Sequence, residues 1–358
     1  MDKLKVLIVD DALVYRKVLS EAVQNTGLAE VMCTASNGII ALEKIQHHSV
    51  DVVLLDVNMP EMDGIETLKI IRSQYPHIHV IMVSSVGRND AEIVLKALRM
   101  GAMDFLVKPM EADYNKNMKK ITNFLKILFT QIKVRYCSNI TSEAVENIKQ
   151  KLPLSFLDNT TRRINQFKGA DLIVVASSTG GPVALETIFK QLTNEVKIPI
   201  LVVQHMPREF TNMMAKALDK KCALTVEEAK EGQVISNNKV LIAPGGFHLT
   251  VSSEGNIKKV RLKSTPHVNG VRPAADVLFK SVAEHYAGKK VIAVILTGMG
   301  SDGMRGVKEL KKNCHCYCIT QSKDSCAVYG MPKSVFEAGL SDEVVALEDI
   351  AARLKQLV

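Results

Sequence analysis

Five short apolar runs recur between residues 5 and 109, and segments with helical spacing of apolar positions separate them. Such alternation predicts βαβ units, in which parallel strands form one sheet with helices on both faces. The runs are KVLIVD, AEVMCTAS, DVVLLD, HVIMVSS and DFLVKP. The N-terminal part of the chain is therefore predicted to be a doubly wound (βα)5 α/β domain.

The pattern changes near residue 121, where apolar residues recur on one face of a helix. This amphipathic helix closes the first domain, which we assign to residues 1–125. The segment from Cys137 to Gly169 is polar, mixed in charge and without a strand pattern, so residues 126–168 are predicted to be a helical or flexible linker. The helix face consists of Ile121, Phe124, Leu125, Leu128, Phe129 and Ile132.

A second alternation of apolar runs and helical segments fills the rest of the chain. The runs are DLIVVAS, IPILVVQH, KVLIAPGG, KKVIAVILTG and CHCYCITQ. They predict a second doubly wound parallel-sheet α/β domain over residues 169–358.

Composition agrees with two domains, because 358 residues with 47% hydrophobic and 23% charged residues can bury a substantial core. No apolar run reaches the roughly 18 residues of a membrane span. The start of the chain, MDKLKVLIVDD, carries acids where a signal peptide would be apolar. We expect a cytoplasmic protein without membrane insertion.

The net charge of +8 raises the question of nucleic acid, but the basic residues are scattered, and only the stretch from Lys116 to Arg135 is enriched. That stretch is typical of a solvated helix face, so no nucleic-acid partner is expected. Seven cysteines argue against a disulfide framework. Alternate side chains of a strand lie about 7 Å apart, which favours buried strand residues over a metal site at Cys314, Cys316 and Cys318.

In open parallel sheets, ligands bind at the carboxyl ends of the strands. In the first domain these ends carry Asp10, Asp11, Asp56, Ser84 and Lys108. Three carboxylates brought together repel one another unless a cation lies between them, and oxygen ligands suit Mg²⁺. A carboxylate beside Mg²⁺ and an ammonium can attack a phosphoryl group, which a serine hydroxyl can then hydrogen-bond.

The motifs VDD, LLDVNMPEMDG, MVSS and FLVKP resemble those of response-regulator receiver domains, which have a flavodoxin-like fold. The resemblance covers residues 3 to about 125. It implies a phosphoacceptor, a metal site formed by three carboxylates and a backbone carbonyl, a serine–lysine switch pair and an aromatic switch residue. These are, in order, Asp56; Asp10, Asp11, Asp56 and Asn58; Ser84 and Lys108; and Phe105.

The first run of the second domain ends in SSTGG, a hydroxyl-rich turn with two glycines. Such a turn can cradle phosphate, present a nucleophile or let a strand pack closely on a helix. The pattern G-x-G-x-x-G is missing, and no Gly-Lys-Ser/Thr follows, which excludes the dinucleotide and Walker-type loops.

A serine nucleophile needs a base and a carboxylate at neighbouring strand ends. His205 ends one apolar run, and Asp302 lies in the glycine-rich loop after another, where the backbone N–H of Met299 could face an oxyanion. Spacing alone leaves two choices open, between Ser177 and Ser178 and between His205 and His248.

The motifs ASSTGGP, QHMP, IAPGGFHL, LTGMGSDG and AVYGMPK resemble the catalytic domain of the chemotaxis protein-glutamate methylesterases over residues 170 to 355. The resemblance implies that Ser178 is the nucleophile, His205 the base and Asp302 the orienting acid. It also implies that Thr179 and Met299 line the site.

The two resemblances together imply a phosphorylation-activated serine esterase. It would hydrolyse glutamate γ-methyl esters on the cytoplasmic domains of methylated chemoreceptors, release methanol and also deamidate selected glutamines. A chemotaxis histidine kinase would be the phosphodonor, Mg²⁺ would serve receiver phosphorylation, and the esterase reaction would need no cofactor. A transcriptional regulator and a non-catalytic receptor adaptor are the alternatives, but the first would require a helix-turn-helix rather than a second α/β sheet.

Overall fold

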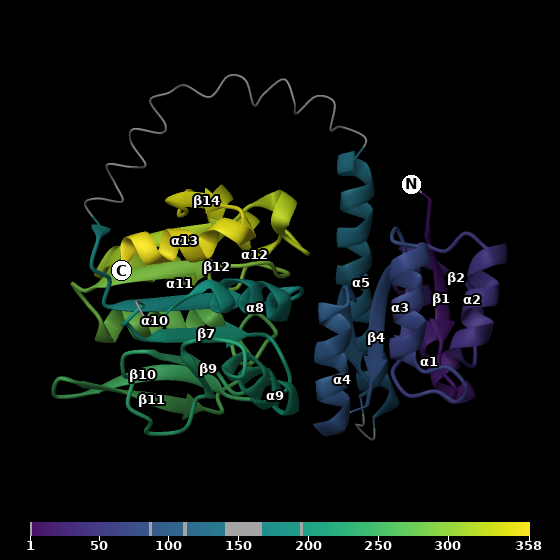
Figure 1. Cartoon of the computed structure of the whole chain (residues 1–358), viewed down its shortest axis with the longest axis horizontal. Helices are drawn as coiled ribbons and strands as arrows, with labels where there is room; N and C mark the ends of the chain where they lie inside the picture. Colours follow the sequence, from purple (N-terminus) through teal and green to yellow (C-terminus); the bar gives the residue numbers. More distant parts are fainter. Residues whose placement is uncertain (1, 86–87, 110–112, 140–166, 194–195) are drawn as a thin grey trace. The chain divides into compact units, whose positions relative to one another are not determined.

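A computed structural model of the chain describes residues 2–85, 88–109, 113–139, 167–193 and 196–358. The chain divides into two compact units, Met1–Leu152 and Pro153–Val358 (Figure 1). We call them the N-terminal and the C-terminal unit. None of the helices that the structure describes has the length and apolar character of a membrane span.

The N-terminal unit contains one parallel sheet of five strands in the order β2-β1-β3-β4-β5. Strand β3 is buried throughout and β1 nearly so, which explains why their sequences are continuous apolar runs. The predicted doubly wound (βα)5 fold is confirmed. The elements are β1 (Leu4–Val9), α1 (Leu13–Asn25), β2 (Ala29–Ala35), α2 (Gly38–His47), β3 (Val52–Asp56), α3 (Gly64–Gln74), β4 (His79–Ser84), α4 (Arg88–Arg99), β5 (Asp104–Val107) and α5 (Tyr114–Asn139).

Helix α5 carries the predicted amphipathic face, and it packs against α1. Ile121, Leu125, Leu128, Phe129 and Ile132 are buried, as the helical spacing required. The helix continues past residue 125, where the sequence led us to end the domain, and reaches Asn139. The rest of the predicted linker up to residue 166 lies outside the described residues.

The C-terminal unit is built on a parallel sheet of seven strands in the order β14-β13-β12-β6-β7-β9-β8, with an added antiparallel hairpin of β10 and β11 (Figure 1). The predicted parallel α/β fold is again confirmed. Its strands are β6 (Leu172–Ser177), β7 (Ile200–Gln204), β8 (Thr225–Glu228), β9 (Lys239–Ile242), β10 (His248–Glu254), β11 (Ile257–Lys263), β12 (Lys290–Ile295), β13 (His315–Gln321) and β14 (Glu343–Val345). Its helices are α8 (Gly181–Gln191), α9 (Arg208–Asp219), α10 (Ala275–His285), α11 (Met304–Asn313), α12 (Met331–Glu337) and α13 (Leu347–Leu357), with the 3₁₀ turn η2 (Lys323–Ser325).

Strand β6 lies at the point where the strand order of this sheet reverses. It pairs with β12 on one side and with β7 on the other. The connections that lead to these two strands run in opposite directions from β6, so the carboxyl end of β6 lies between them. A crevice for a ligand is expected at such a switch point. The turns that follow β6, β7 and β12 are therefore where a site should be sought.

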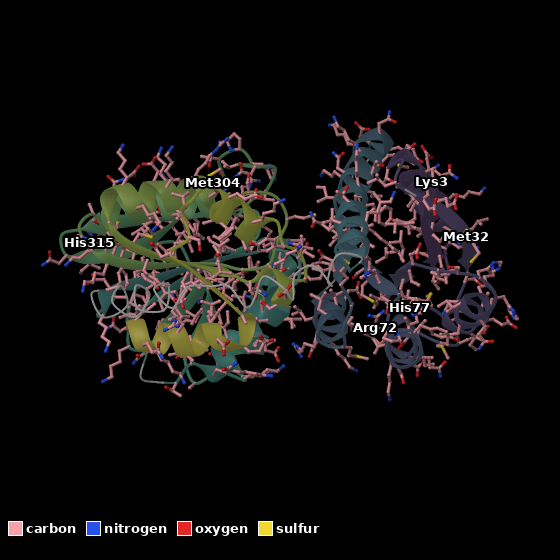
Figure 2. The ribbon with its side chains drawn as sticks, turned by 90° about the horizontal axis from the view of Figure 1, so that it is seen from above. Lys3, Met32, Arg72, His77, Met304 and His315 are labelled. Carbon is pink, nitrogen blue, oxygen red and sulfur yellow. The ribbon has the colours of Figure 1, made fainter. Side chains whose placement is uncertain are left out.

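The alternating cysteines lie on β13 and in the residue before it. Cys314 and Cys318 are buried, and the thiol of Cys314 lies 3.1 Å from the carbonyl oxygen of Tyr286. Burial raises the pKa of Cys316 to about 12, which keeps its thiol protonated. His315 is exposed at the start of the strand (Figure 2). These contacts agree with strand residues rather than with metal ligands.

Candidate functional site

Three carboxylates meet at the carboxyl ends of β1 and β3. Asp10 and Asp11 follow β1, Asp56 ends β3, and one oxygen from each lies within 4.8 Å of the others. The Lys108 ammonium is 2.8 Å from Asp10 Oδ2 and 3.0 Å from Asp56 Oδ2. Asp10 and Asp56 are buried, whereas Asp11 is exposed. The strand-end argument thus placed these four residues together correctly.

In the described part of the chain, Lys108 is the only cation that forms ion pairs with the carboxylates of this cluster. Burial and the neighbouring charge of Asp10 raise the pKa of Asp56 to about 6, although Lys108 opposes the shift. One ammonium therefore faces two buried carboxylates and an exposed one. Hard oxygen donors with excess negative charge fit a divalent cation such as Mg²⁺.

The remaining residues predicted for this site surround the cluster. Ser84 is buried at the end of β4, and its carbonyl oxygen accepts a hydrogen bond from the backbone N–H of Lys108 at 2.8 Å. Phe105 is buried on β5. Asn58 is exposed, and its side chain donates to Asp90 at 3.1 Å. Tyr15 was missed by the sequence analysis. Its ring centroid lies 4.6 Å from the Lys108 ammonium, and no local pattern predicts a contact between these separate elements.

In the C-terminal unit, the two adjacent serines differ in their surroundings. Ser177 is fully buried at the end of β6 and donates to Gln204 Oε1 at 2.7 Å. Ser178 is partly exposed, and its backbone N–H donates to the carbonyl of Thr297 at 3.0 Å. The chain then turns through Gly180, whose φ of 75° favours glycine, into helix α8. Ser178 therefore presents the accessible hydroxyl.

His205 lies beside this turn. The register pairs Ser177 with Gln204, and the backbone N–H of His205 donates to the Ser177 carbonyl at 3.1 Å. Ser178 and His205 are thus the next residues on two adjacent strands. The Nε2 atom of His205 is 2.8 Å from Asp302 Oδ2, which leaves Nδ1 as the nitrogen available to a nucleophile.

The competing histidine, His248, has both ring nitrogens engaged by the backbone. Its Nε2 lies 3.0 Å from the carbonyl of Pro266, and its Nδ1 accepts from the backbone N–H of Ala274 at 3.2 Å. The ring is fully buried, and burial lowers its pKa below the ordinary value. His248 therefore supports the loop and has no free nitrogen for catalysis.

Asp302 is buried, yet its carboxylate accepts several hydrogen bonds from protein donors. Besides His205, it accepts from the backbone N–H groups of Ala275 at 2.6 Å and Asp276 at 3.1 Å, and from Asn269 Nδ2 at 2.8 Å. Burial by itself would raise the pKa of Asp302, but the hydrogen bond from His205 and those from the backbone hold it below its usual value. The ionised form needed to orient an imidazole is thus favoured.

The loop after β12 closes the site around Ser178. A Cβ on Gly298 would lie 2.7 Å from the Ser178 Cβ, so only glycine allows this approach. Among the described residues, none accepts a hydrogen bond from the backbone N–H of Met299. Thr179 is buried, and its carbonyl accepts from the Thr297 hydroxyl at 2.9 Å. A loop N–H with no partner beside a serine is the arrangement that an oxyanion requires.

Three residues of this site were missed by the sequence analysis. Gln204 links the turn to the base, because its Nε2 donates to the carbonyls of Ser178 at 2.9 Å and His205 at 3.3 Å. A polar amide that ends an apolar run was its available signal. Asn269 and Asp276 surround Asp302, and the Asn-Gly pair at 269–270 marked a turn without showing where it would point.

Comparison with known proteins agrees with this geometry. The sequence model of the response regulator receiver domain matches residues 6–122, and that of CheB methylesterase matches residues 173–354. Proteins called protein-glutamate methylesterase/protein-glutamine glutaminase from Geobacillus kaustophilus and Pyrococcus horikoshii are 40% and 36% identical to the chain. The first match covers 100% of this chain and 99% of that protein, and the second covers 97% and 92%. The crystal structure of the Thermotoga maritima CheB methylesterase catalytic domain is 42% identical, with a TM-score of 0.51, over 53% of this chain and all of that one.

A receiver domain followed by a domain with a serine, a histidine and an aspartate at the switch point defines a response regulator with an enzymatic output domain. Both halves of that description are matched over nearly their whole lengths. The chain belongs to the CheB methylesterase family.

Proposed function

We propose that this protein is a phosphorylation-activated esterase that hydrolyses glutamate γ-methyl esters on the cytoplasmic domains of methylated chemoreceptors and acts in the cytoplasm. The observation that carries the proposal is the 2.8 Å contact between His205 Nε2 and Asp302 Oδ2 beside the partly exposed Ser178. The names of the relatives supply the substrate class.

In this proposal Ser178 attacks the ester carbonyl while His205 Nδ1 takes its proton. Asp302 stabilises the imidazolium, and the Met299 N–H donates to the oxyanion at the edge lined by Thr179. The imidazolium returns the proton to the departing methoxy group, which leaves as methanol and gives an acyl-enzyme on Ser178. A water molecule activated by His205 then attacks the acyl carbonyl, and the glutamate carboxylate and the serine hydroxyl are restored.

The same site would deamidate selected receptor glutamines. An amide carbonyl passes through an equivalent tetrahedral intermediate, and ammonia replaces methanol as the leaving group. The relatives carry glutaminase as the second half of their name, which supports this second substrate class.

The regulatory site of the proposal is the acidic cluster of the N-terminal unit. Asp56 accepts the phosphoryl group from a chemotaxis histidine kinase. Asp10, Asp11, Asp56 and the backbone carbonyl of Asn58 would hold Mg²⁺, which would supply charge neutralisation. Ser84 and Lys108 contact the phosphoryl group as the switch pair. Phe105 is the aromatic switch residue.

We also assign the two activities to separate parts of the chain. Residues 1–125 would form the receiver, and residues 169–358 the catalytic domain. Residues 126–168 would connect them. The two family matches, which end at residue 122 and begin at residue 173, support this division.

The test is methanol release from a methylated chemoreceptor cytoplasmic fragment, with and without a small phosphodonor and Mg²⁺. We expect release that rises with the phosphodonor and is abolished in Ser178→Ala. Absence of release from folded protein with a cognate receptor, in both conditions, would favour the adaptor function instead.

A further inference from the structure

Two buried carboxylates of the C-terminal unit each cap the start of the helix next to the other. Asp302, just before α11, accepts from the first N–H groups of α10, those of Ala275 and Asp276. Asp276, in the first turn of α10, accepts through Oδ1 from the N–H groups of Gly303 at 3.0 Å and Gly306 at 2.8 Å, at the start of α11. Because helix N-termini leave such donors unpaired, this exchange ties the two helix starts together.

One side-chain amide bridges the two carboxylates. Asn269 Nδ2 lies 2.9 Å from Asp276 Oδ2 and 2.8 Å from Asp302 Oδ1, so each of its two hydrogens can serve one acid. Burial, and to a smaller extent the charge of Asp302, raises the pKa of Asp276. The amide is thus a donor placed between two acids that would otherwise repel each other.

The turn that holds this amide is a β-turn with a two-residue loop. Val268 and Val271 exchange backbone hydrogen bonds at 3.1 and 3.0 Å, and the residues between them, Asn269 and Gly270, have φ of 54° and 78°. Positive φ at both positions is the signature of a type I′ turn, for which Asn-Gly is the preferred pair. The backbone conformation of this turn therefore sets the position of the Asn269 amide, which contacts Asp302.

We propose that Asn269 and Asp276 are positioning residues of the esterase site, which hold Asp302 in the orientation that places His205 Nδ1 toward Ser178. The inference rests on the proposed function. Each oxygen of the Asp302 carboxylate accepts one backbone N–H, Oδ2 that of Ala275 and Oδ1 that of Asp276. The Asn269 amide adds a second donor to Oδ1, the oxygen that does not contact His205. Without Asn269, Oδ1 keeps a single donor and the bridge between Asp302 and Asp276 is lost, so the two carboxylates repel each other. The resulting shift of Asp302 moves the imidazole that it contacts out of alignment with the nucleophile.

The decisive variant is Asn269→Gly in the full chain. Glycine adopts a φ of 54° without strain, so the backbone turn is retained while both amide hydrogen bonds are lost. We expect kcat for methanol release to fall about 100-fold, since small misalignments cost that much, with an unchanged KM for the receptor fragment. The thermal midpoint is expected to fall by only a few degrees, because two hydrogen bonds to buried carboxylates are lost, and the protein remains folded at the assay temperature.

The matched control is Asn238→Gly. Asn238 also has a left-handed backbone conformation, with a φ of 60°, and it is exposed in a turn. Its backbone carbonyl accepts a hydrogen bond from the backbone N–H of Thr225. It should leave kcat unchanged. A second variant, Asp276→Asn, presents an amide donor to the Asn269 amide and is expected to lower kcat in the same way without raising KM.

The rate at which a fluorophosphonate labels Ser178 gives a readout that needs no receptor. The same fall in labelling rate is expected in Asn269→Gly, whereas unchanged labelling and unchanged kcat would overturn the positioning role. An effect on KM alone would also contradict it. Wild-type protein that labels normally but releases no methanol would instead refute the proposed function, because labelling reports the nucleophile and methanol reports the substrate.

Discussion

Ser177 and Ser178 are adjacent in the sequence, but only one faces a site. The hydroxyl of Ser177 is enclosed and paired with Gln204, whereas that of Ser178 is accessible beside His205. Burial therefore separates two residues that the strand-end argument could not separate. A hydroxyl with a buried partner contributes to stability, and an accessible one beside a base is available for chemistry.

Ser177→Ala tests this difference. It leaves Gln204 Oε1 without its 2.7 Å partner, so the free energy of unfolding should fall by about 1–3 kcal/mol. Methanol release should be retained, in contrast to Ser178→Ala. Denaturant unfolding of the full chain and the methanol assay measure the two effects, and loss of activity in folded Ser177→Ala protein would contradict the assignment of Ser178.

His248 is predicted to make stability depend on pH. Its folded-state pKa is lowered from 6.5, first by burial and also by Arg272 and His267, while the Pro266 carbonyl and Asp302 act in the opposite direction. Since the unfolded chain binds the proton more readily, this contribution is present above pH 6.5 and is lost as the pH falls toward the folded-state pKa. The slope from one such group is at most about 1.4 kcal/mol per pH unit.

The corresponding variant is His248→Gln. It should be less stable than the wild type at pH 7, because both ring hydrogen bonds are altered, but it should lose less stability between pH 7 and 5. Unfolding followed at both pH values checks this. An equal loss of stability in both proteins would show that another group carries the pH dependence.

At the scale of elements, burial decided which strands the sequence could reveal. All ten apolar runs contain strands, and most of these strands are buried on both faces, as is usual inside parallel sheets. The edge strand β2, with only its two end residues fully buried, is an exception. The four strands that were missed contain polar residues: β8 reads TVEE, β10 reads HLTVSSE, β11 reads IKKVRLK, and β14 reads EVV. Short edge strands and a hairpin with polar residues in both strands have no continuous apolar run to detect.

The same physical reason limits what the sequence showed of the site. Residues that end buried strands, such as Asp56, His205 and Ser178, could be found because the parallel sheet brings strand ends together. Asn269 and Asp276 lie in a turn and in a helix, and their contacts with Asp302 depend on how the turn folds back. No local pattern encodes such a contact.

Gly298→Ala tests the turn that follows β12. The added Cβ would lie 2.5 Å from the Met331 sulfur and 2.7 Å from the Ser178 Cβ, so the loop or the serine must move. A shift of about 1 Å at a reacting group can lower kcat about 100-fold. Gly288→Ala is the control, because at a φ of 72° with no atom within 4 Å it should cost about 1 kcal/mol of stability and leave kcat unchanged.

At the scale of the whole molecule, the acidic cluster and the serine site belong to different units of one chain. Asp56→Asn should therefore remove the response of methanol release to the phosphodonor, since an amide cannot form the acyl phosphate. The control is Asp51→Asn, just before the opposite end of β3, where the side chain accepts from the backbone N–H of Lys5 at 2.7 Å. If Asp56→Asn were still stimulated by the phosphodonor, another residue would have to be the phosphoacceptor.

The turn at Asn269 and Gly270 is also a site where spontaneous deamidation is expected. In an Asn-Gly pair the following backbone nitrogen can attack the side-chain amide, and the succinimide that forms opens to aspartate or isoaspartate. At this position the product would set a third carboxylate against Asp276 and Asp302, in place of the donor that joins them. An enzyme proposed to deamidate its receptors would thus itself be inactivated by deamidation of Asn269. The change would be detected as a slow gain in mass and a loss of turnover during storage.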